Sequence, residues 1–352
     1  MITLTGFGYE KQLKNPSKVF NNTWIDKSFI NGPSIKTFEQ QFANYCDTDE
    51  SVAVGSCTSA LQLSLLALEV GRGDEVITVP YTWVSSVEVI KQVGATPVFV
   101  DINKDDMCID TTAVAKKITN KTKAIIGVDL FGNVCDIDSL KEFNLPVIQD
   151  AAQSTGAEYK NKKVGSLSNL TCFSFYPTKN LGCWGDAGAV TGDKKLLDTI
   201  RQLRNHGQRE RFAADIVGWN SRMDTIQAEI LLNKLPLLDK HNQRRIQIAK
   251  IYDSELYNIV GVPKQNENSK HVYHQYVICH PNVDQIQEWL HSRKIQSRRY
   301  YPTPLHKTMP YKDSNSYPVS EYYSANALAI PVHQYLTDKE VGTIIKAIKQ
   351  AT

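Results

Sequence analysis

Two side chains in this sequence, Asp150 and Lys179, have the types and the settings that chemistry on an aldehyde cofactor requires. Asp150 ends the apolar run Pro146–Asp150, so its carboxylate is expected at the edge of a sheet. Lys179 lies five positions after Ser174, which ends another predicted strand, in a loop bounded by proline and glycine. A lysine amine forms an imine with an aldehyde, and a carboxylate can hold a pyridine nitrogen protonated. Together the pair indicates chemistry of the pyridoxal phosphate (PLP) type.

Each of these residues also has a plainer interpretation. A loop lysine is usually solvated, and an aspartate after a strand often caps a helix. The run Ser56–Ala60 is open to two interpretations as well, because its free amides and helix dipole suit a phosphate, whereas Thr58 or Ser59 could simply cap the helix. No single segment therefore identifies a site, and only their combination points to a cofactor.

The elements that must position these residues follow from the hydrophobic pattern. Short β-branched runs alternate with amphipathic stretches, which predicts βαβ units and a mostly parallel sheet. Apolar residues at helical spacing, such as Ile35, Phe38 and Phe42, predict the covering helices. Because crossovers are right-handed and cover both faces, we expect a buried sheet with a ligand at the carboxyl ends of its strands. The strands are expected at Ser51–Val54, Glu75–Val79, Pro97–Asp101, Lys123–Asp129 and Pro146–Asp150.

The pattern changes after Gly192. Two long helical stretches, Lys194–Asn205 and Ser221–Tyr257, predict a spine between two lobes. The second lobe is expected to contain a strand and two helices, at His271–Cys279, Asp284–Arg293 and Asp338–Lys349. We therefore predict an α/β chain with an N-terminal arm and large cofactor-binding domain at residues 1–240, and a smaller α+β domain at residues 241–352.

Composition narrows the class of protein. The chain has 352 residues, 41% hydrophobic and 22% charged, which is an ordinary globular balance for about two domains. The 40 basic and 37 acidic residues leave a net charge of +3, so no nucleic-acid partner is expected. The sequence has neither a run of about 18 apolar residues nor a signal peptide, so we expect a cytoplasmic protein without a membrane partner. The seven cysteines include no C-x-x-C pair, which argues against a disulfide framework and a zinc site, and no metal is predicted.

Several further motifs follow one another in order along nearly the whole chain. They are Asp150–Gln153, Ser174–Gly182, Gly185–Gly188, Asn31–Pro33, Gly73–Ile77, Gly94–Asp101, Gly218–Asp224 and Tyr301–His306. In these motifs the chain resembles the DegT/DnrJ/StrS family of PLP-dependent nucleotide-sugar aminotransferases. The resemblance implies the type I fold of PLP-dependent transferases, the aspartate aminotransferase-like arrangement of a mostly parallel sheet domain and a smaller C-terminal domain.

The resemblance implies a role for each candidate side chain at the cofactor. Lys179 would carry PLP as a Schiff base and then act as the general base and acid that moves a proton. Asp150 would pair with the pyridinium nitrogen, and Gln153 would contact the ring hydroxyl region. Trp83 would stack on the ring face, although an indole in this apolar context also fits a hydrophobic core. The implied phosphate ligands are Cys57, which stands where relatives often carry glycine, Thr58, Ser174 and, from the second subunit, Asn220.

The same resemblance implies residues for the sugar substrate. Those for the hexose are Tyr176, Tyr301 and His306, and those for a phosphate or carboxylate are Arg209, Arg211 and Arg222. A surface arginine is commonly just solvated, and Tyr301 could simply pack against Tyr300.

The implied reaction is a transamination in two half-reactions. L-glutamate gives its amine to the cofactor, which gives it to a ketone on a dTDP- or UDP-linked 6-deoxyhexose. The motif Gly185–Gly188 resembles enzymes acting at C-3 more than those acting at C-4, so a 3-keto sugar is predicted and a 4-keto sugar is the alternative. A PLP-dependent dehydratase would carry histidine in place of Lys179, and a non-catalytic homologue would usually carry a DNA-binding module. A homodimer with shared active sites is expected.

Overall fold

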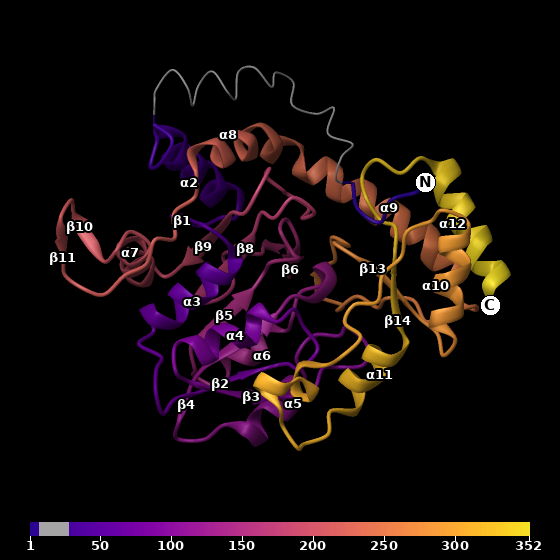
Figure 1. Ribbon diagram of the computed structural model, residues 1–352, viewed down its shortest axis with the longest axis horizontal. Helices are drawn as coiled ribbons and strands as arrows, with labels where there is room; N and C mark the ends of the chain where they lie inside the picture. Colours follow the sequence, from indigo (N-terminus) through magenta and orange to yellow (C-terminus); the bar gives the residue numbers. More distant parts are fainter. Residues whose placement is uncertain (7–27) are drawn as a thin grey trace.

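The computed structural model describes residues 1–6 and 28–352 and is built around a seven-stranded sheet (Figure 1). Residues 7–27 of the predicted N-terminal arm lie outside the described residues. The strand order is β1-β9-β8-β5-β4-β2-β3. The bounds are Ser51–Val54 (β1), Glu75–Thr78 (β2), Thr96–Phe99 (β3), Thr122–Val128 (β4), Val147–Asp150 (β5), Leu170–Ser174 (β8) and Gly188–Gly192 (β9). The five predicted strands are thus confirmed, with ends that differ by a residue or two.

One strand, β9, runs against its two neighbours. The other pairings in the sheet, from β8 through β5, β4 and β2 to β3, are all parallel. β9 follows β8 after a loop without a crossover helix, and a chain that turns back in this way pairs antiparallel. The prediction of a mostly parallel sheet is confirmed, and the reversed strand is an addition to it.

Helices cover the sheet, as the βαβ pattern predicts. Their bounds in the first part of the chain are Pro33–Tyr45 (α2), Cys57–Ala67 (α3), Ser85–Gln92 (α4), Thr111–Val114 (α5), Ile137–Lys141 (α6) and Lys194–Leu203 (α7). Aromatic rings fix α2: Phe38 and Phe42 stack with ring centroids 5.5 Å apart, and Phe42 meets Phe173 of β8 edge to face at 4.9 Å. Such pairs add to the free energy of burial, and their spacing of four residues puts both rings on one helix face.

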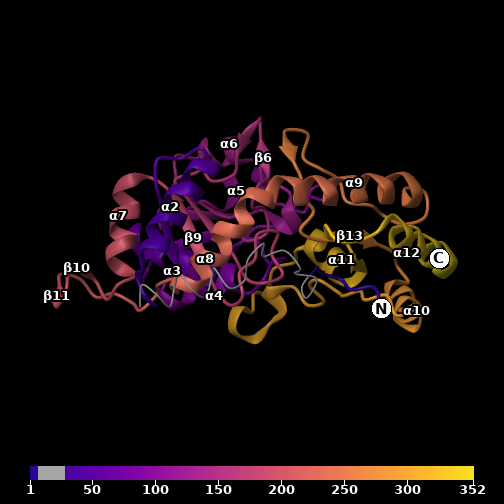
Figure 2. The same cartoon turned by 90° about the horizontal axis from the view of Figure 1, so that it is seen from above.

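The predicted spine consists of two helices, α8 (Thr225–Lys234) and α9 (Leu238–Leu256), joined by a 3₁₀ turn that contains Pro236. α9 extends from the large lobe into the smaller one (Figure 2). A second hydrophobic core begins at Ile248 in this helix. The predicted domain boundary between residues 240 and 241 therefore falls inside a continuous helix, and the division stays a prediction.

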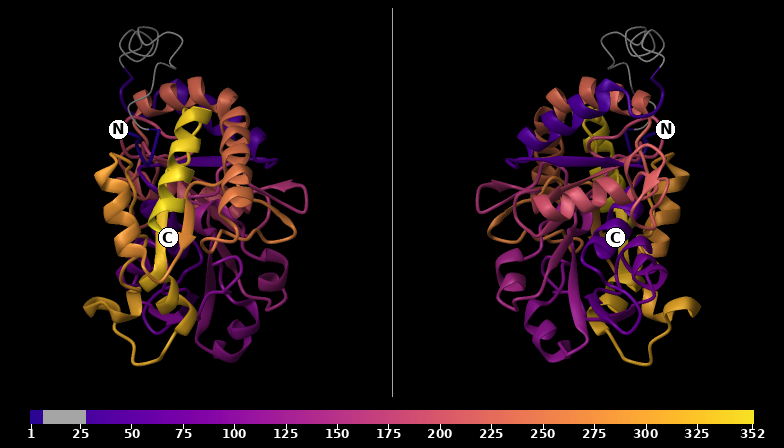
Figure 3. Two further views of the ribbon diagram at one scale, coloured as in Figure 1. Left: turned by 90° about the vertical axis from the view of Figure 1, so that its right-hand side faces the viewer. Right: turned by 90° about the vertical axis from the view of Figure 1, so that its left-hand side faces the viewer.

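The smaller lobe is α+β. Its elements are β13 (Tyr276–Cys279), α10 (Val283–Ser292), α11 (Pro318–Asn326), β14 (Ala327–Ile330) and α12 (Asp338–Ala351). β13 and β14 pair antiparallel, and the yellow α12 stands between α10 and α9 (Figure 3, left). The sequence analysis anticipated α10 and α12 but missed α11 and β14.

The strand predicted at His271–Cys279 is wrong in its first half. The chain forms the short β12 (Ser269–Lys270), which pairs with β6 (Glu158–Tyr159), and resumes extended pairing only at β13. Between them Arg245 of α9 donates to the carbonyl oxygens of Tyr273 and His274. These carbonyls face a helix instead of a neighbouring strand, so the segment cannot continue a β ladder.

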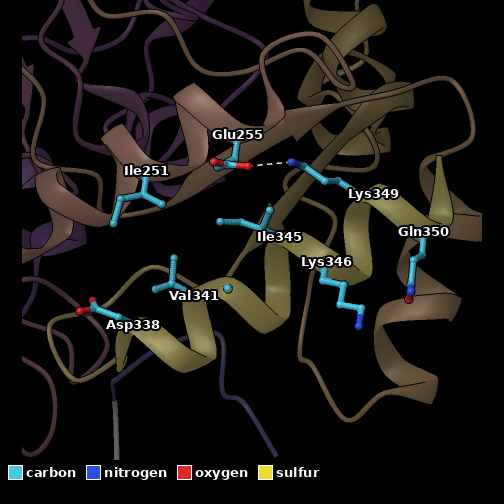
Figure 4. A pocket seen from close by; sticks show the side chains of 9 residues that line it. Ile251, Glu255, Asp338, Val341, Ile345, Lys346, Lys349 and Gln350 are labelled. Atoms are coloured by element: carbon cyan, nitrogen blue, oxygen red, sulfur yellow. Dashed lines mark hydrogen bonds and ion pairs between the residues drawn. The ribbon is translucent and has the colours of Figure 1, made fainter.

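Two surface features complete the fold. The hairpin of β10 (Gln208–Glu210) and β11 (Ala213–Ala214) projects beyond α7, at the end of the molecule opposite α10 and α12 (Figures 1 and 2). A groove of about 510 Å³ lies between α9 and α12, where Ile251, Val341 and Ile345 form its floor (Figure 4). None of the helices that the structure describes is long and apolar enough to cross a membrane.

Candidate active site

The carboxyl ends of β5 and β8 bring Asp150 and Lys179 to one edge of the sheet. Asp150 is the last residue of β5 and pairs with Cys172 in β8, and Lys179 lies in the loop that follows β8. Burial raises the pKa of the Asp150 carboxyl above its ordinary value, and the charge of Lys179 opposes this rise. Burial likewise lowers the pKa of the Lys179 amine, and the electrostatic interactions with Cys57 and Asp150 oppose this decrease. Each group thus acts on the pKa of the other, as members of one site do.

Asp150 is held by donors on both oxygens. Ser86 Oγ donates to Oδ2 at 2.7 Å, and the Ala152 amide donates to Oδ1 at 3.2 Å. Ser86 is buried at the start of α4, and its own hydroxyl lies 3.0 Å from Thr82 Oγ1. Ser86 was not predicted from the sequence as a site residue. A signal was present, because two serines open a helix just after a parallel strand, at the edge where a ligand is expected.

The N-terminus of α3 lies at the same edge and has the form of a phosphate cradle. Ser56 is the N-cap, with its Oγ accepting from the Ser59 amide at 3.1 Å, so the interpretation that Thr58 or Ser59 caps this helix is wrong. No acceptor for the Cys57 and Thr58 amides is found among the described residues, which is usual for the first turn of a helix. These amides remain available to an anion.

Ser174 is aligned with this cradle through the sheet. Val54 of β1 pairs with Gly188 of β9, and Gly188 pairs with Ser174 of β8, so the three residues form one row across the strands. A Cβ atom on Gly188 would lie 2.6 Å from the carbonyl carbon of Ser56, which shows how closely the start of α3 approaches this row. The Ser174 hydroxyl and the α3 amides therefore lie at the same edge.

Gln153, Tyr301 and Trp83 lie together on the ring side of the site. Gln153 Oε1 accepts from the Phe131 amide at 2.6 Å, and its Nε2 donates to the Tyr301 hydroxyl at 3.0 Å. The Tyr301 ring stacks with that of Phe131 and has its centroid 6.3 Å from that of Trp83. Trp83 is 58% exposed, so it is not a core residue and its indole is accessible to a ligand. Phe131 was not anticipated from the sequence.

His306, which was predicted to bind the hexose, is buried in the structure. Its side chain is 1% exposed, its Nε2 lies 3.2 Å from Glu321 Oε1, and its ring packs edge to face on Tyr317. A hexose finds no exposed atom of His306 in this arrangement, because the chain itself covers the ring. Its assignment to the sugar stays a prediction.

No contact of Lys179 with the candidate arginines or Asn220 is found among the described residues, although the Gly55 amide, just before α3, donates to the Ser221 carbonyl at 3.3 Å. Arg209 and Arg211 are exposed on and beside the projecting hairpin, and Arg211 lies over the Phe212 ring. Arg222 donates to Asn205 Oδ1 at 3.1 Å, and Asn220 is exposed where it bridges to Asn205. Tyr176, in contrast, is half-exposed in the Lys179 loop itself. The structure therefore divides the predicted site residues between the sheet edge and the hairpin region.

The sheet-edge residues fit PLP. A buried carboxylate, an amine of lowered pKa and free amides at a helix N-terminus match the pyridine nitrogen, the aldehyde and the phosphate in turn. The groove between α9 and α12 (Figure 4) contains none of these residues.

Comparison with known proteins agrees with this geometry. Residues 10–349 match the model of the DegT/DnrJ/EryC1/StrS aminotransferase family. The chain belongs to this family. It is therefore a PLP-dependent nucleotide-sugar aminotransferase of the type I fold, and the resemblance seen in the sequence is confirmed.

Three relatives of this aminotransferase illustrate the similarity. It is 37% identical to dTDP-3-amino-3,4,6-trideoxy-alpha-D-glucose transaminase of Streptomyces venezuelae, over 92% of this chain and 88% of that protein. It is also 37% identical to UDP-2-acetamido-2-deoxy-3-oxo-D-glucuronate aminotransferase of Pseudomonas aeruginosa, over 91% of each chain. The crystal structure of S. venezuelae DesV in complex with a ketimine intermediate superimposes with a TM-score of 0.92 at 35% identity, covering 95% of this chain and 93% of that one.

Proposed function

We propose that this aminotransferase moves the amino group of L-glutamate to the 3-keto group of a dTDP- or UDP-linked 6-deoxyhexose. The observation that carries the proposal is the meeting of Asp150 and Lys179 at one sheet edge, beside free amides at the start of α3. The keto position draws support from two of the relatives, the transaminase of S. venezuelae and the aminotransferase of P. aeruginosa, since each is named for an amino or oxo group at position 3 of the sugar.

The proposed mechanism assigns a task to each group of the sheet edge. When bound, PLP supplies an aldehyde that carries the amino group and a ring that takes up electron density. Burial favours the neutral form of the Lys179 amine, which a general base needs in order to take a proton and then return it. Ser86 orients the Asp150 carboxylate, which would pair with the ring nitrogen of bound PLP, and a cation placed there would favour the ionised form of Asp150.

The remaining residues bind and orient. The Cys57 and Thr58 amides and the Ser174 hydroxyl would hold the phosphate of bound PLP, and the exposed indole of Trp83 would cover the ring and exclude water from it. Gln153 is fixed by the Phe131 amide and so keeps a defined orientation toward the ring hydroxyl. Tyr176, half-exposed in the lysine loop, and Tyr301, held by Gln153, would contact the hexose.

A panel of substrates tests the keto position. Purified protein with PLP and L-glutamate is incubated with 3-keto and 4-keto sugars linked to dTDP or UDP, and the products are analysed by mass spectrometry. We expect turnover of a 3-keto sugar at least ~10-fold faster than of its 4-keto isomer, because a misplaced ketone loses alignment with Lys179. Amination of 4-keto sugars alone would contradict the proposal while leaving the aminotransferase class intact.

We further propose that the protein is a homodimer whose subunits share each active site. The projecting hairpin region carries apolar side chains that a monomer leaves in water, among them Phe212 at 86% and Val217 at 83% exposure. Asn220, Arg209 and Arg211 are exposed in the same region. A twofold partner would cover the apolar residues and receive Asn220 as a phosphate ligand. A cytoplasmic location stays a prediction.

Mixing two inactive variants tests the shared site. A heterodimer of Lys179→Ala and Asn220→Ala subunits contains one site with both defects and one intact site. We expect activity to rise to about a quarter of the wild-type value at equal mixing, because half of the dimers then hold one intact site. The test requires that Asn220→Ala alone has little transamination activity and that exchange of subunits between the two variants is demonstrated. No recovery under those conditions would refute the assignment of Asn220 across the interface.

A further inference from the structure

The loop that carries Lys179 closes on itself. The Lys179 amide donates to the Tyr176 carbonyl at 2.8 Å, and the Cys183 amide donates to the Phe175 carbonyl at 2.8 Å. A Cβ atom on Gly182 would lie 2.5 Å from the Pro177 carbonyl oxygen, so the two ends of the loop touch. These bonds give the loop its shape. They do not determine how the loop is oriented toward Asp150.

One buried side chain in this loop, Asn180, reaches outside it. Asn180 is 7% exposed, whereas Tyr176 in the same loop is 50% exposed. Its Nδ2 donates to Asn242 Oδ1 at 2.7 Å and to the Val272 carbonyl at 3.1 Å. Its Oδ1 lies 3.2 Å from His274 Nδ1. The whole amide is thus engaged by groups from other parts of the chain.

The engagement of Asn180 determines the tautomer of His274. Because both Nδ2 hydrogens of Asn180 are donated elsewhere, its Oδ1 faces His274 and can only accept, so Nδ1 of the imidazole carries the hydrogen. Burial, and then the charges of Lys179 and Arg245, lower the pKa of His274 well below its ordinary value, so the ring is neutral. The His274 imidazole is therefore neutral and donates from Nδ1 to Asn180 in the lysine loop.

Helix α9 holds the other end of this arrangement. Asn242 and Arg245 are three residues apart and share a helix face. Asn242 Nδ2 donates to the Thr155 carbonyl at 3.1 Å, in the turn after Asp150. The buried Arg245 donates to the carbonyls of Tyr273 at 3.2 Å and Val332 at 2.7 Å. The spine helix therefore contacts the lysine loop, the segment that carries His274 and the turn after Asp150.

We propose that Asn180, His274 and Asn242 are positioning residues that align the Lys179 amine with Asp150 by tying the lysine loop to the spine helix. The proposal rests on the assignment of Lys179 as the lysine that binds the cofactor. Loss of one of these hydrogen bonds leaves the internal bonds of the loop in place, but the loop is then less firmly oriented toward Asp150. A misalignment of about 1 Å is enough to lower a rate by ~10²-fold.

The test compares variants that differ in one hydrogen bond. Asn180→Ala and Asn242→Ala each remove the hydrogen bond between the lysine loop and α9. His274→Leu removes the N–H that donates to Asn180, whereas His274→Asn keeps an N–H close to the position of Nδ1. Tyr252→Phe is the matched control, because it deletes one buried hydrogen bond, from the hydroxyl to the Pro331 carbonyl at 2.9 Å, in the second core. We expect kcat to fall ~10- to 100-fold in the alanine and leucine variants, with KM for both substrates changed less than ~3-fold. His274→Asn should recover most of kcat.

A second readout needs no cofactor. Lys179 in cofactor-free protein is labelled with a small amine-reactive reagent over a range of pH, and its peptide is quantified by mass spectrometry. Asp150, Cys57 and His274 are the titratable groups that interact with this amine. Freeing the loop exposes the amine to water, so the midpoint of labelling should rise by about half a pH unit or more in the variants and not in Tyr252→Phe.

The outcomes distinguish the positioning role of Asn180, His274 and Asn242 from the assignment of Lys179 as the lysine that binds the cofactor. If kcat and the labelling midpoint of the alanine and leucine variants match those of Tyr252→Phe, the positioning role is refuted. If His274→Leu equals His274→Asn in both readouts, the tautomer argument is wrong. If borohydride attaches the cofactor to a lysine other than Lys179, the site assignment fails instead. Should Asn180→Ala not fold, the His274 pair decides the question alone.

Discussion

Replacing Lys179 with alanine is expected to lower the rate of transamination by roughly 10⁴-fold or more, because both the covalent link to PLP and the proton transfer depend on this amine. Its loop follows β8 and faces Asp150 of β5, and burial lowers the pKa of the amine. The measurement is the steady-state rate with glutamate and the keto sugar, together with borohydride reduction of the wild type and mass spectrometry of the labelled peptide.

Two further variants make this result specific. Lys179→Arg keeps a positive charge but cannot form the imine, so it should be as inactive as the alanine variant. Lys264→Ala removes a lysine whose side chain is 67% exposed and pairs with Asp105 on the surface, so it should retain full activity. Borohydride labelling of any other lysine peptide would show that the site is assigned wrongly.

Replacing Asp150 with asparagine should lower the rate by roughly 10²- to 10⁴-fold, which corresponds to an electrostatic contribution of about 3–6 kcal/mol. The substitution keeps the shape of the side chain and an oxygen that can accept from Ser86, so the cofactor should still bind. The measurements are the rate and the visible absorbance of bound cofactor. Near-normal transamination by this variant would mean that the anion at Asp150 is not needed.

The same substitution should stabilise the cofactor-free protein at neutral pH. Burial raises the pKa of Asp150 in the folded chain, so above the unfolded pKa the native state binds more protons than the unfolded state. Asp150 therefore contributes a decrease in the free energy of unfolding as pH rises from its unfolded pKa to its raised folded pKa, and this contribution is absent from the asparagine variant. We expect Asp150→Asn to gain about 0.5–2 kcal/mol at pH 7 and to lose less stability than the wild type as pH rises above the unfolded pKa of aspartate, as measured by thermal unfolding. An equal pH dependence in both proteins would rule out Asp150 as its source.

Local patterns in the sequence were enough to predict the strands, the covering helices and the positions of Asp150 and Lys179 at strand ends. Alternation of β-branched runs with amphipathic stretches depends on residues close together in the chain, and β1 to β5 appear where this alternation predicts them. Parallel strands bring their carboxyl ends to one edge, so the meeting of the two residues followed from topology alone.

Only the tertiary structure decided which side chains complete the site. Gln153 reaches Tyr301 across 148 positions of sequence, and His274 reaches Asn180 across 94. The exposure of Trp83 and the burial of His306 likewise depend on what packs over each residue. Periodicity reports the face of an element that is apolar, but it does not report which distant element covers that face. The interruption of the strand predicted at 271–279 has the same origin, because Arg245 of α9 takes carbonyls that a strand would have used.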